Sequence, residues 1–299
     1  MKIFLGVTDR EWYSQLQALP VDEVNFWKPG APENWHSLSV GEPFLFKRKG
    51  TPHVITGGGF FVRYSRMPAS IAWAAFGLKN GRKSSEDLKR TINTITNQSS
   101  PDPQVGCIIL TQPFFLDQEE WIPIPEWSNS IVSGKSYDTE NADGAKIWKQ
   151  VSERLDYANF MDISEYERYK ERTILQRVGQ GGFRVLVMDA YNRRCAITGE
   201  KTLPVLQASH IKPYSEDGTH LVNNGMLLRS DVHTLFDAGY ITVTPEYKVE
   251  VSSRIRTEFE NGRDYYAFHG KQLISLPEKP NQRPAPEFLV WHNEHKYAA

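Results

Sequence analysis

The alternation of apolar and polar positions in the first third of the chain is typical of strands. Such runs cover residues 2–7, 43–47, 53–64 and 106–116, whereas residues 69–76 and 85–95 have the apolar spacing of short helices. Strands that only a few helices interrupt favour a barrel-like α+β domain. The pattern therefore predicts a compact domain over residues 1–140.

Three consecutive glycines interrupt the third of these runs. Gly57, Gly58 and Gly59 lie inside a strand pattern, where glycine marks a bulge or a close approach of another backbone segment. Neither a Lys-Ser/Thr pair nor the start of a helix follows them, so they lack the pattern of a phosphate-binding loop. We expect a bulged strand at this point.

The pattern becomes helical near residue 144. Ile147, Val151, Leu155 and Ala158 follow one another at spacings of four, four and three, which predicts a helical linker over residues 141–178. Residues 179–299 form the predicted C-terminal domain. At its centre we expect a strand at 204–211, a polar loop at 214–224, a helix at 231–238 and a strand at 240–243.

The tail beyond residue 246 contains strand-like and proline-rich pieces, among them residues 277–286. Such pieces do not continue a helix or a central strand, so we expect them to wrap around the C-terminal domain. His269, His292 and His295 lie in this tail. We expect all three at the surface.

Two histidines and an asparagine stand in the predicted strand, loop and helix. His210, Asn224 and His233 follow the spacing H-x13-N-x8-H. Phosphodiester cleavage requires a base that accepts a proton from water, and a cation that neutralises charge on the leaving oxygen. Histidine suits either purpose, because its unperturbed pKa of about 6.5 leaves it mostly neutral. The asparagine can hold the intervening loop through side-chain hydrogen bonds to the backbone.

The residues around this motif resemble those of the HNH (ββα-metal) nuclease family. The shared strings are C-A-I-T-G from residue 195, A-S-H-I-K-P from residue 208 and N-G-M-L-L-R-S-D-V-H-T-L-F-D-A-G from residue 224. The resemblance covers roughly residues 176–245 and implies a C-terminal ββα-metal nuclease domain. It also implies that His210 is the general base, that Asn224 orients the loop and the base, and that His233 is a metal ligand.

The same resemblance implies one divalent cation, Mg²⁺ or Mn²⁺, in each active site. Many members carry Asp or His immediately before the base, where this chain has Ser209, and a neutral hydroxyl is a poor ligand. Asp237 lies one helical turn after His233 and can supply a carboxylate instead. It can equally accept a hydrogen bond from the His233 ring, and the sequence leaves these two roles open.

Cysteine usage limits the other metal chemistry. Some HNH domains are held together by zinc on four cysteines, but this chain has only Cys107 and Cys195, so a structural four-cysteine zinc site is excluded. The two cysteines fall in different predicted domains, which argues against a disulfide and favours a reducing compartment. There is no signal-peptide pattern and no long apolar run, so the sequence predicts a cytoplasmic protein without a membrane partner.

The net charge of −1 does not point to a nucleic-acid binder, so a DNA surface has to be a local concentration of charge. Residues 165–212 contain nine Lys or Arg against five Asp or Glu. In and beside this segment, Arg193, Arg194, Lys212 and Arg229 are candidate phosphate contacts. Each can also be an ordinary solvated surface charge.

The predicted N-terminal domain is rich in tryptophan, with Trp12, Trp27, Trp35, Trp73, Trp121 and Trp127. Its length, its order of strands and short helices, and the phrase LSVGEPFLFK at residues 38–47 resemble the PUA superfamily, whose EVE, YTH and ASCH domains read modified bases. The resemblance implies a PUA-like β-barrel that holds a flipped base between aromatic walls, for which we expect Trp27 and Trp73. The same tryptophans can instead be core packing.

The two resemblances together imply a modification-dependent restriction endonuclease of antiphage defence. Its substrate would be double-stranded DNA that carries a modified cytosine such as 5-methylcytosine. An HNH site grips one phosphate and has little base specificity, so a separate reader domain would supply the discrimination. Two alternatives stay open: an HNH nuclease whose first domain recognises a sequence or a partner protein, and a nucleic-acid reader with a weak HNH scaffold, which Ser209 suggests. The sequence also leaves open whether two chains form a homodimer.

Overall fold

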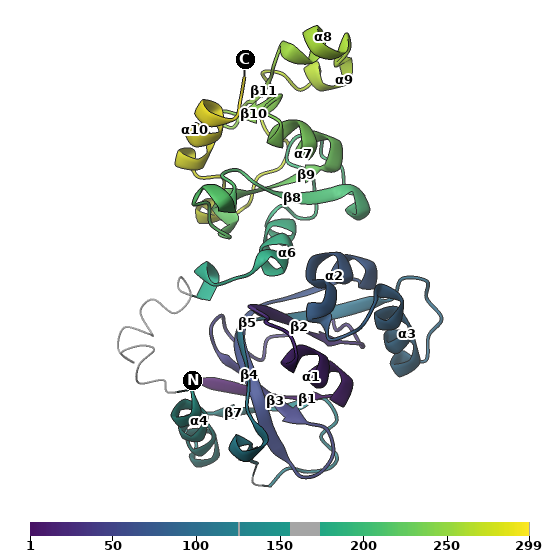
Figure 1. Ribbon diagram of the computed structural model, residues 1–299, viewed down its shortest axis with the longest axis vertical. Helices are drawn as coiled ribbons and strands as arrows, with labels where there is room; N and C mark the ends of the chain where they lie inside the picture. The colour runs from purple at the N-terminus through teal and green to yellow at the C-terminus, as the bar shows by residue number, and fades with distance from the viewer. Residues whose placement is uncertain (125, 156–173, 299) are drawn as a thin grey trace. The chain divides into compact units, whose positions relative to one another are not determined.

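The computed structural model describes residues 1–124, 126–155 and 174–298. The chain divides into two compact units, residues 1–182 and residues 183–299, and each has its own helices and strands. Figure 1 shows the elements of both units, coloured along the chain. Within the described ranges, no helix is long and apolar enough to cross a membrane.

A seven-stranded sheet forms the centre of the first unit. Its strands are β1 (Lys2–Thr8), β2 (Glu23–Lys28), β3 (Pro43–Arg48), β4 (Val54–Pro68), β5 (Gln104–Phe115), β6 (Ile122–Pro123) and β7 (Gly134–Asp138). They follow the order β2-β5-β4-β3-β1-β7, and β6 pairs with β4 beside this path. The pair β1 and β3 is parallel, and the other pairs are antiparallel.

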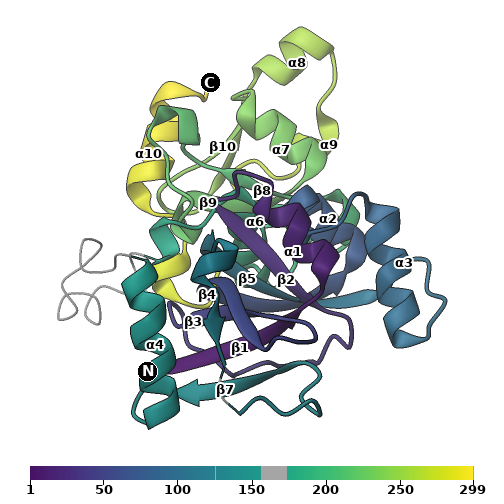
Figure 2. The same ribbon diagram turned by 60° about the horizontal axis from the view of Figure 1, so that its bottom comes forward.

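Among the described residues, these strands are connected or flanked by the helices α1 (Arg10–Gln17), α2 (Ala69–Phe76), α3 (Ser85–Thr96) and α4 (Ala142–Arg154). The helices predicted at residues 69–76 and 85–95 and the four predicted strands are confirmed. Sequence reasoning missed α1, β2 and β7, because short amphipathic segments between longer elements give a weak periodic signal. Figure 2 shows α4 beside β7 and the N-terminal end of β1.

The predicted PUA-like barrel is not confirmed, although the α+β class is. A closed barrel requires hydrogen bonds between the first and the last strand of the sheet. Among the described strands, the path ends at β2 on one side and at β7 on the other. Since β2 pairs with β5 and β7 pairs with β1, the sheet has two edges in place of a closed ring.

The glycines of β4 lie where its pairing with β5 shifts. The register changes between Gly58 and Phe60, which confirms the predicted bulge. A Cβ on Gly57 would lie 2.2 Å from the carbonyl oxygen of Phe114. Only glycine permits this close approach of two backbones.

Helix α4 packs into the core of the first unit. Ile147 and Val151 are buried together with Ile3, Leu5 and Leu45 of the sheet. The apolar positions from which the sequence predicts a helical linker therefore hold α4 against the strands. The predicted continuation at residue 158 lies outside the described residues.

A buried carboxylate holds the glycine-rich start of α6 (Gln180–Ala190). Glu23 on β2 accepts hydrogen bonds from the backbone N–H groups of Gly181 and Gly182, at 2.8 and 2.9 Å. The ammonium of Lys79 lies 3.2 Å from the same carboxylate. A carboxylate is favourable here because the free N–H groups of a helix start carry partial positive charge. A Cβ on Gly181 would lie 2.6 Å from the carbonyl oxygen of Ala75, so glycine is required.

The second unit contains a hairpin followed by a helix. Its elements are β8 (Leu206–His210), β9 (Gly225–Arg229), α7 (Ser230–Asp237), β10 (Ile241–Val243), β11 (Val249–Val251), α8 (Arg254–Phe259), α9 (Arg263–Tyr266) and α10 (Pro286–His295). Strands β8 and β9 pair antiparallel, and α7 follows β9 directly (Figure 1). The predicted order of strand, loop and helix is confirmed.

One histidine of the C-terminal tail is buried, so its predicted place at the surface was wrong. His292 on α10 is 2% exposed, and its ring stacks on Phe236 at 3.7 Å between centroids. Its Nε2 donates to the Phe236 carbonyl at 3.1 Å, and its Nδ1 lies 2.8 Å from Thr242 Oγ1. These partners come from α7 and β10, which a reading of the tail alone does not reveal. Burial lowers the pKa of His292 to about 4. His269 and His295 are exposed, as expected.

Candidate active site

The loop between β8 and β9 is fastened by the asparagine of the motif. Asn224 is fully buried. Its Oδ1 accepts the backbone N–H of Lys212, and its Nδ2 donates to the carbonyls of Lys212 and Thr219, each at 2.9 Å. One side chain therefore ties together the two ends of the loop. This is the loop-holding contact that the sequence predicts for Asn224.

His210 stands at the end of β8, at the entrance to this loop. Its ring stacks on Phe183, with 3.9 Å between centroids and 11° between planes. Burial, and secondly the nearby His220, lower the pKa of His210 to about 4. The imidazole is therefore neutral at physiological pH, which is the form that accepts a proton.

His220 is part of the site and was missed by sequence reasoning. His220 Nδ1 lies 3.0 Å from His210 Nε2. Tyr214 stacks on the His220 ring, with 4.6 Å between centroids and 6° between planes. The available sequence signal was a third histidine inside the polar loop between His210 and Asn224. In the structure it follows Thr219, whose carbonyl accepts from Asn224.

His233 on α7 has a partner on each side of its ring. Its Nδ1 lies 2.7 Å from Gln207 Oε1, and its Nε2 lies 3.2 Å from Asp237 Oδ2. If Nδ1 donates to the glutamine oxygen, Nε2 presents a lone pair beside a carboxylate oxygen. Two acceptors at this distance fit the adjacent ligand positions of an octahedral ion, which are about 3.0 Å apart for bonds of about 2.1 Å. Gln207 was not predicted, and a single glutamine in a strand gives no signal for such a role.

The side chain of Asp237 is 61% exposed. A cation held by His233 and Asp237 would therefore have room for further oxygen ligands. Within the part of the chain that the structure describes, no group of three or more His, Cys, Asp or Glu has metal-binding geometry. A two-residue site suits Mg²⁺ or Mn²⁺, which keeps several waters or takes phosphate oxygens. The residues present therefore fit a divalent ion that the substrate helps to bind.

Ser209 is not a partner of His233 or Asp237. The residue is fully buried, and its hydroxyl donates to the carbonyl of His210 at 3.3 Å. The Ser209 hydroxyl therefore has a backbone partner within β8. The carboxylate near His233 is that of Asp237 on α7.

Cys195 and Arg229 both have protein partners. Cys195 Sγ accepts the backbone N–H groups of Thr198 and Arg229 at 3.4 and 3.2 Å. The guanidinium of Arg229 forms two hydrogen bonds to Asp231, at 2.7 and 2.8 Å, and Tyr265 donates to the same carboxylate at 3.3 Å. Arg229 lowers the pKa of Asp231. This ion pair lies at the start of α7.

The other predicted phosphate contacts, Arg193, Arg194 and Lys212, are all partly exposed. The ammonium of Lys212 lies 5.6 Å from the ring centroid of Trp291, beside the loop that Asn224 holds. Arg193 is near Asp189 at 3.8 Å and has a positive φ of 55°. Arg194 is partly exposed. Lys212 follows His210 by two residues, so it lies at the start of the loop that Asn224 holds.

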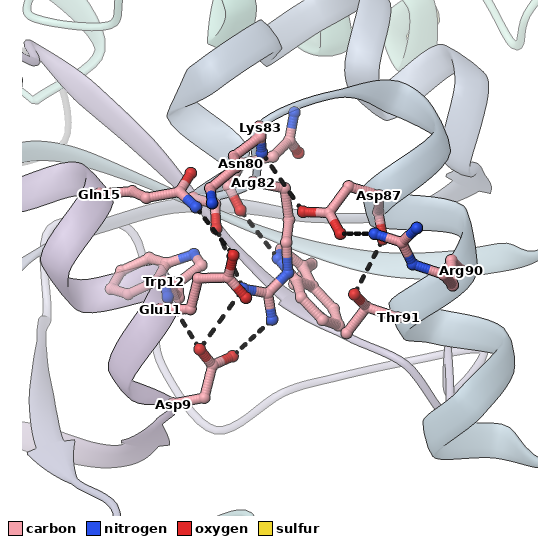
Figure 3. Close-up of polar contacts among 12 residues, drawn as sticks. Asp9, Glu11, Trp12, Gln15, Asn80, Arg82, Lys83, Asp87, Arg90 and Thr91 are labelled. Atoms are coloured by element: carbon pink, nitrogen blue, oxygen red, sulfur yellow. Dashed lines mark hydrogen bonds and ion pairs between the residues drawn. The ribbon is translucent and has the colours of Figure 1, made fainter.

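In the first unit, Trp27 is a packed residue. Its ring is 8% exposed, its Nε1 donates to the Asn80 carbonyl at 2.9 Å, and the guanidinium of Arg82 lies 5.1 Å from the ring centroid. Arg82 is in turn bound to Asp9 at 2.8 Å and to Glu11 at 3.2 Å, and Figure 3 shows these carboxylates around it. A base could stack on Trp27 only after this arrangement opened.

The six tryptophans of the first unit divide by exposure. Trp12, Trp27 and Trp127 are buried, and Trp35, Trp73 and Trp121 are partly exposed. The buried members pack against other rings or cations, as Trp12 does with Phe26 at 5.4 Å. Of the two predicted cage residues, Trp73 on α2 is therefore the one that is partly exposed.

The hairpin and helix bring together a neutral histidine and a second histidine beside a carboxylate, which is the arrangement that the resemblance to ββα-metal nucleases implies. Comparison with known families agrees: residues 195–244 match the HNH endonuclease family. No curated protein matches the chain. Among solved structures, the chain is similar to a modification-dependent TagI restriction endonuclease, with 14% sequence identity, a TM-score of 0.29, and coverage of 91% of this chain and 75% of that chain.

The chain therefore carries an HNH endonuclease domain, and the protein is an enzyme of this class. HNH nucleases generally use a divalent metal ion. The family match lies wholly within the second unit and includes His210, Asn224, His233 and Asp237.

Proposed function

We propose that the protein is a metal-dependent DNA endonuclease that cuts double-stranded DNA carrying modified cytosine, as a restriction enzyme does. The observation that carries the nuclease part is the placement of a neutral His210 in the same small site as the pair of His233 and Asp237. His233 and Asp237 both lie near enough to His210 to act on its pKa, so the three residues belong to one site.

In the proposed reaction, His210 takes a proton from water through Nδ1. The water oxygen bonds to phosphorus while the bond from phosphorus to the leaving sugar oxygen breaks, and the leaving oxygen takes a proton from solvent. A divalent cation at His233 and Asp237 would neutralise charge on the phosphate and the leaving oxygen. Gln207 would hold the His233 ring through Nδ1, and Asn224 would hold the loop that follows His210.

Reading of the modified base is proposed for the first unit. A site that grips one phosphate discriminates poorly between bases, so selectivity has to come from another surface. Stacking of an extruded base on an aromatic ring contributes about 1–3 kcal/mol, enough to offset much of the unstacking cost. Trp73 is partly exposed and is our first candidate for such a ring. Trp27 would contribute only after Arg82 moved away.

The burial of Trp27 also favours a second candidate function. In it, the second unit is the same nuclease, but the first unit recognises a DNA sequence or a partner protein and no flipped base. An open base cage requires accessible ring faces, and one of the two expected walls is covered by Arg82. The two candidates differ only in what the first unit selects.

Cleavage of matched duplexes separates them. The full-length protein is mixed with Mg²⁺ or Mn²⁺ and duplexes that differ only in plain, methylated, hydroxymethylated or glucosylated cytosine. We expect cleavage of at least one modified duplex to exceed that of the plain duplex, and Trp73→Ala to reduce this preference by about fivefold or more. Trp121→Ala, at another partly exposed tryptophan, is the matched control. Equal cleavage of all duplexes would reject base reading and leave the endonuclease, whereas no cleavage with any metal would reject the nuclease proposal itself.

A further inference from the structure

The His210 ring has two nitrogens, and they have different surroundings. Nε2 faces His220 Nδ1 at 3.0 Å. Among the described residues, no hydrogen bond reaches Nδ1 of His210. A neutral imidazole carries a proton on one nitrogen only, so the partner of Nε2 decides whether Nδ1 has a lone pair. For Nδ1 to accept a proton from water, the proton of the neutral ring has to lie on Nε2.

The contact with His220 is built into the fold. Asn224 binds the backbone at Lys212, two residues after His210, and at Thr219, one residue before His220. The same side chain therefore fixes the chain near both histidines. Phe183 stacks on His210, and Tyr214 stacks on His220, so each ring has a fixed plane. Fixed planes and a distance of 3.0 Å give the two nitrogens a defined hydrogen-bond geometry.

We propose that His220 is a positioning residue for the general base: its Nδ1 accepts the Nε2 proton of His210 and so keeps Nδ1 of His210 unprotonated and aimed at water. His220 touches neither the substrate nor the cation in this role. The inference rests on the proposed role of His210 as the base, and it adds the residue that selects the reactive tautomer. Groups that orient a catalytic imidazole commonly affect the rate more than the binding of substrate.

Two substitutions distinguish this role from simple packing. His220→Ala removes the acceptor, whereas His220→Asn places an amide oxygen close to the position of Nδ1 and keeps an acceptor there. We expect His220→Ala to lower kcat by about 10- to 100-fold with an unchanged Kd for DNA. We expect His220→Asn to recover most of that loss. His36→Ala, at an exposed histidine of the first unit, is the control for histidine removal as such.

A second measurement does not depend on cleavage. Nitrogen-15 NMR of the histidine side chains reports which ring nitrogen is protonated, and the His210 signals are assigned as those absent from His210→Ala. We expect the Nε2–H tautomer for His210 in the wild-type protein and in His220→Asn, and a mixture of tautomers in His220→Ala. This spectrum can be recorded without metal or DNA.

The outcomes separate the two proposals. An Nδ1–H tautomer in the wild-type protein, or a His220→Ala variant with wild-type kcat and an unchanged spectrum, would overturn the positioning role. A His220→Asn variant as slow as His220→Ala in a correctly folded protein would also overturn it, because the acceptor alone would then not matter. Absence of cleavage by the wild-type protein, with the predicted tautomer present, would count against the nuclease proposal and leave the assignment of the hydrogen bond standing.

Discussion

The two units use their buried polar groups in different ways. In the second unit, Asn224 holds a loop whose histidines, His210 and His220, are partly exposed, and its partners lie within 12 residues along the chain. In the first unit, Arg82 is 3% exposed and binds Asp9, which is 73 residues away, so that its guanidinium covers Trp27. The hydrogen bonds of Asn224 hold a loop with partly exposed histidines. The contacts of Arg82 bury an aromatic ring.

This difference explains why sequence patterns were informative for one unit and not for the other. A site made by neighbouring segments appears in the sequence as a spaced motif, because the spacing itself fixes the geometry. A ring that is covered by a residue far along the chain looks the same in sequence as a ring that is open. The number of tryptophans therefore predicted an aromatic site that includes Trp27 and Trp73. In the structure Trp73 is partly exposed, whereas Trp27 is buried.

The largest effect is expected in the second unit, where a substitution of His210 would remove the proposed general base. His210→Ala should lower cleavage by about 100- to 10,000-fold, the usual contribution of a general base, while DNA binding changes little. Single-turnover cleavage and a filter-binding or anisotropy assay measure the two effects. Retention of activity within about tenfold would remove His210 from the base role.

The pair of His233 and Asp237 gives a second test. EDTA should stop cleavage, Mg²⁺ or Mn²⁺ should restore it, and His233→Ala should be inactive at every metal concentration. Asp237→Asn should need more metal than the wild-type protein and should be partly rescued by it, because an amide oxygen is a weaker ligand than a carboxylate. A titration of rate against metal concentration measures this. An unchanged metal dependence would leave Asp237 as a hydrogen-bond acceptor for the His233 ring.

Substitutions of Trp27 and Trp73 test how each ring contributes to the stability of the first unit. Trp27→Ala should lower the free energy of unfolding by about 3–5 kcal/mol, since it empties a packed site and removes the ring that Arg82 covers. Trp73→Ala should cost clearly less, because that ring is partly exposed. Urea unfolding, followed by tryptophan fluorescence and circular dichroism, measures both. Equal losses for the two variants would contradict the division between a packed and a surface tryptophan.

Acid should destabilise the second unit through His292. The pKa of this ring is about 4 in the folded protein because of burial, against about 6.5 when unfolded, so the unfolded chain takes up the proton first. The stabilisation is complete above about pH 6.5 and is lost as the pH falls towards 4, with a maximum effect of about 3 kcal/mol. Urea midpoints at several pH values should show this slope, and His292→Gln should flatten it. A slope that is unchanged in the variant would assign the acid sensitivity to other groups.

The sequence by itself determined the site of the second unit to a large extent. The spacing of His210, Asn224 and His233 predicted a strand, a loop and a helix, and the structure has β8, the loop and α7 at those positions. These contacts are short in sequence, so local pattern and turn chemistry specify them. The sequence also predicted the bulge in β4. Consecutive glycines inside a strand pattern indicate a close approach of another backbone segment, and the structure has one there.

Only the tertiary structure decided the partners that come from elsewhere along the chain. It supplied Gln207 to the His233 ring and buried His292 against α7. It also left the sheet of the first unit open among the described strands and covered Trp27 with Arg82. Periodicity specifies which face of an element is apolar, but the identity of the group that meets a polar side chain depends on how distant segments pack.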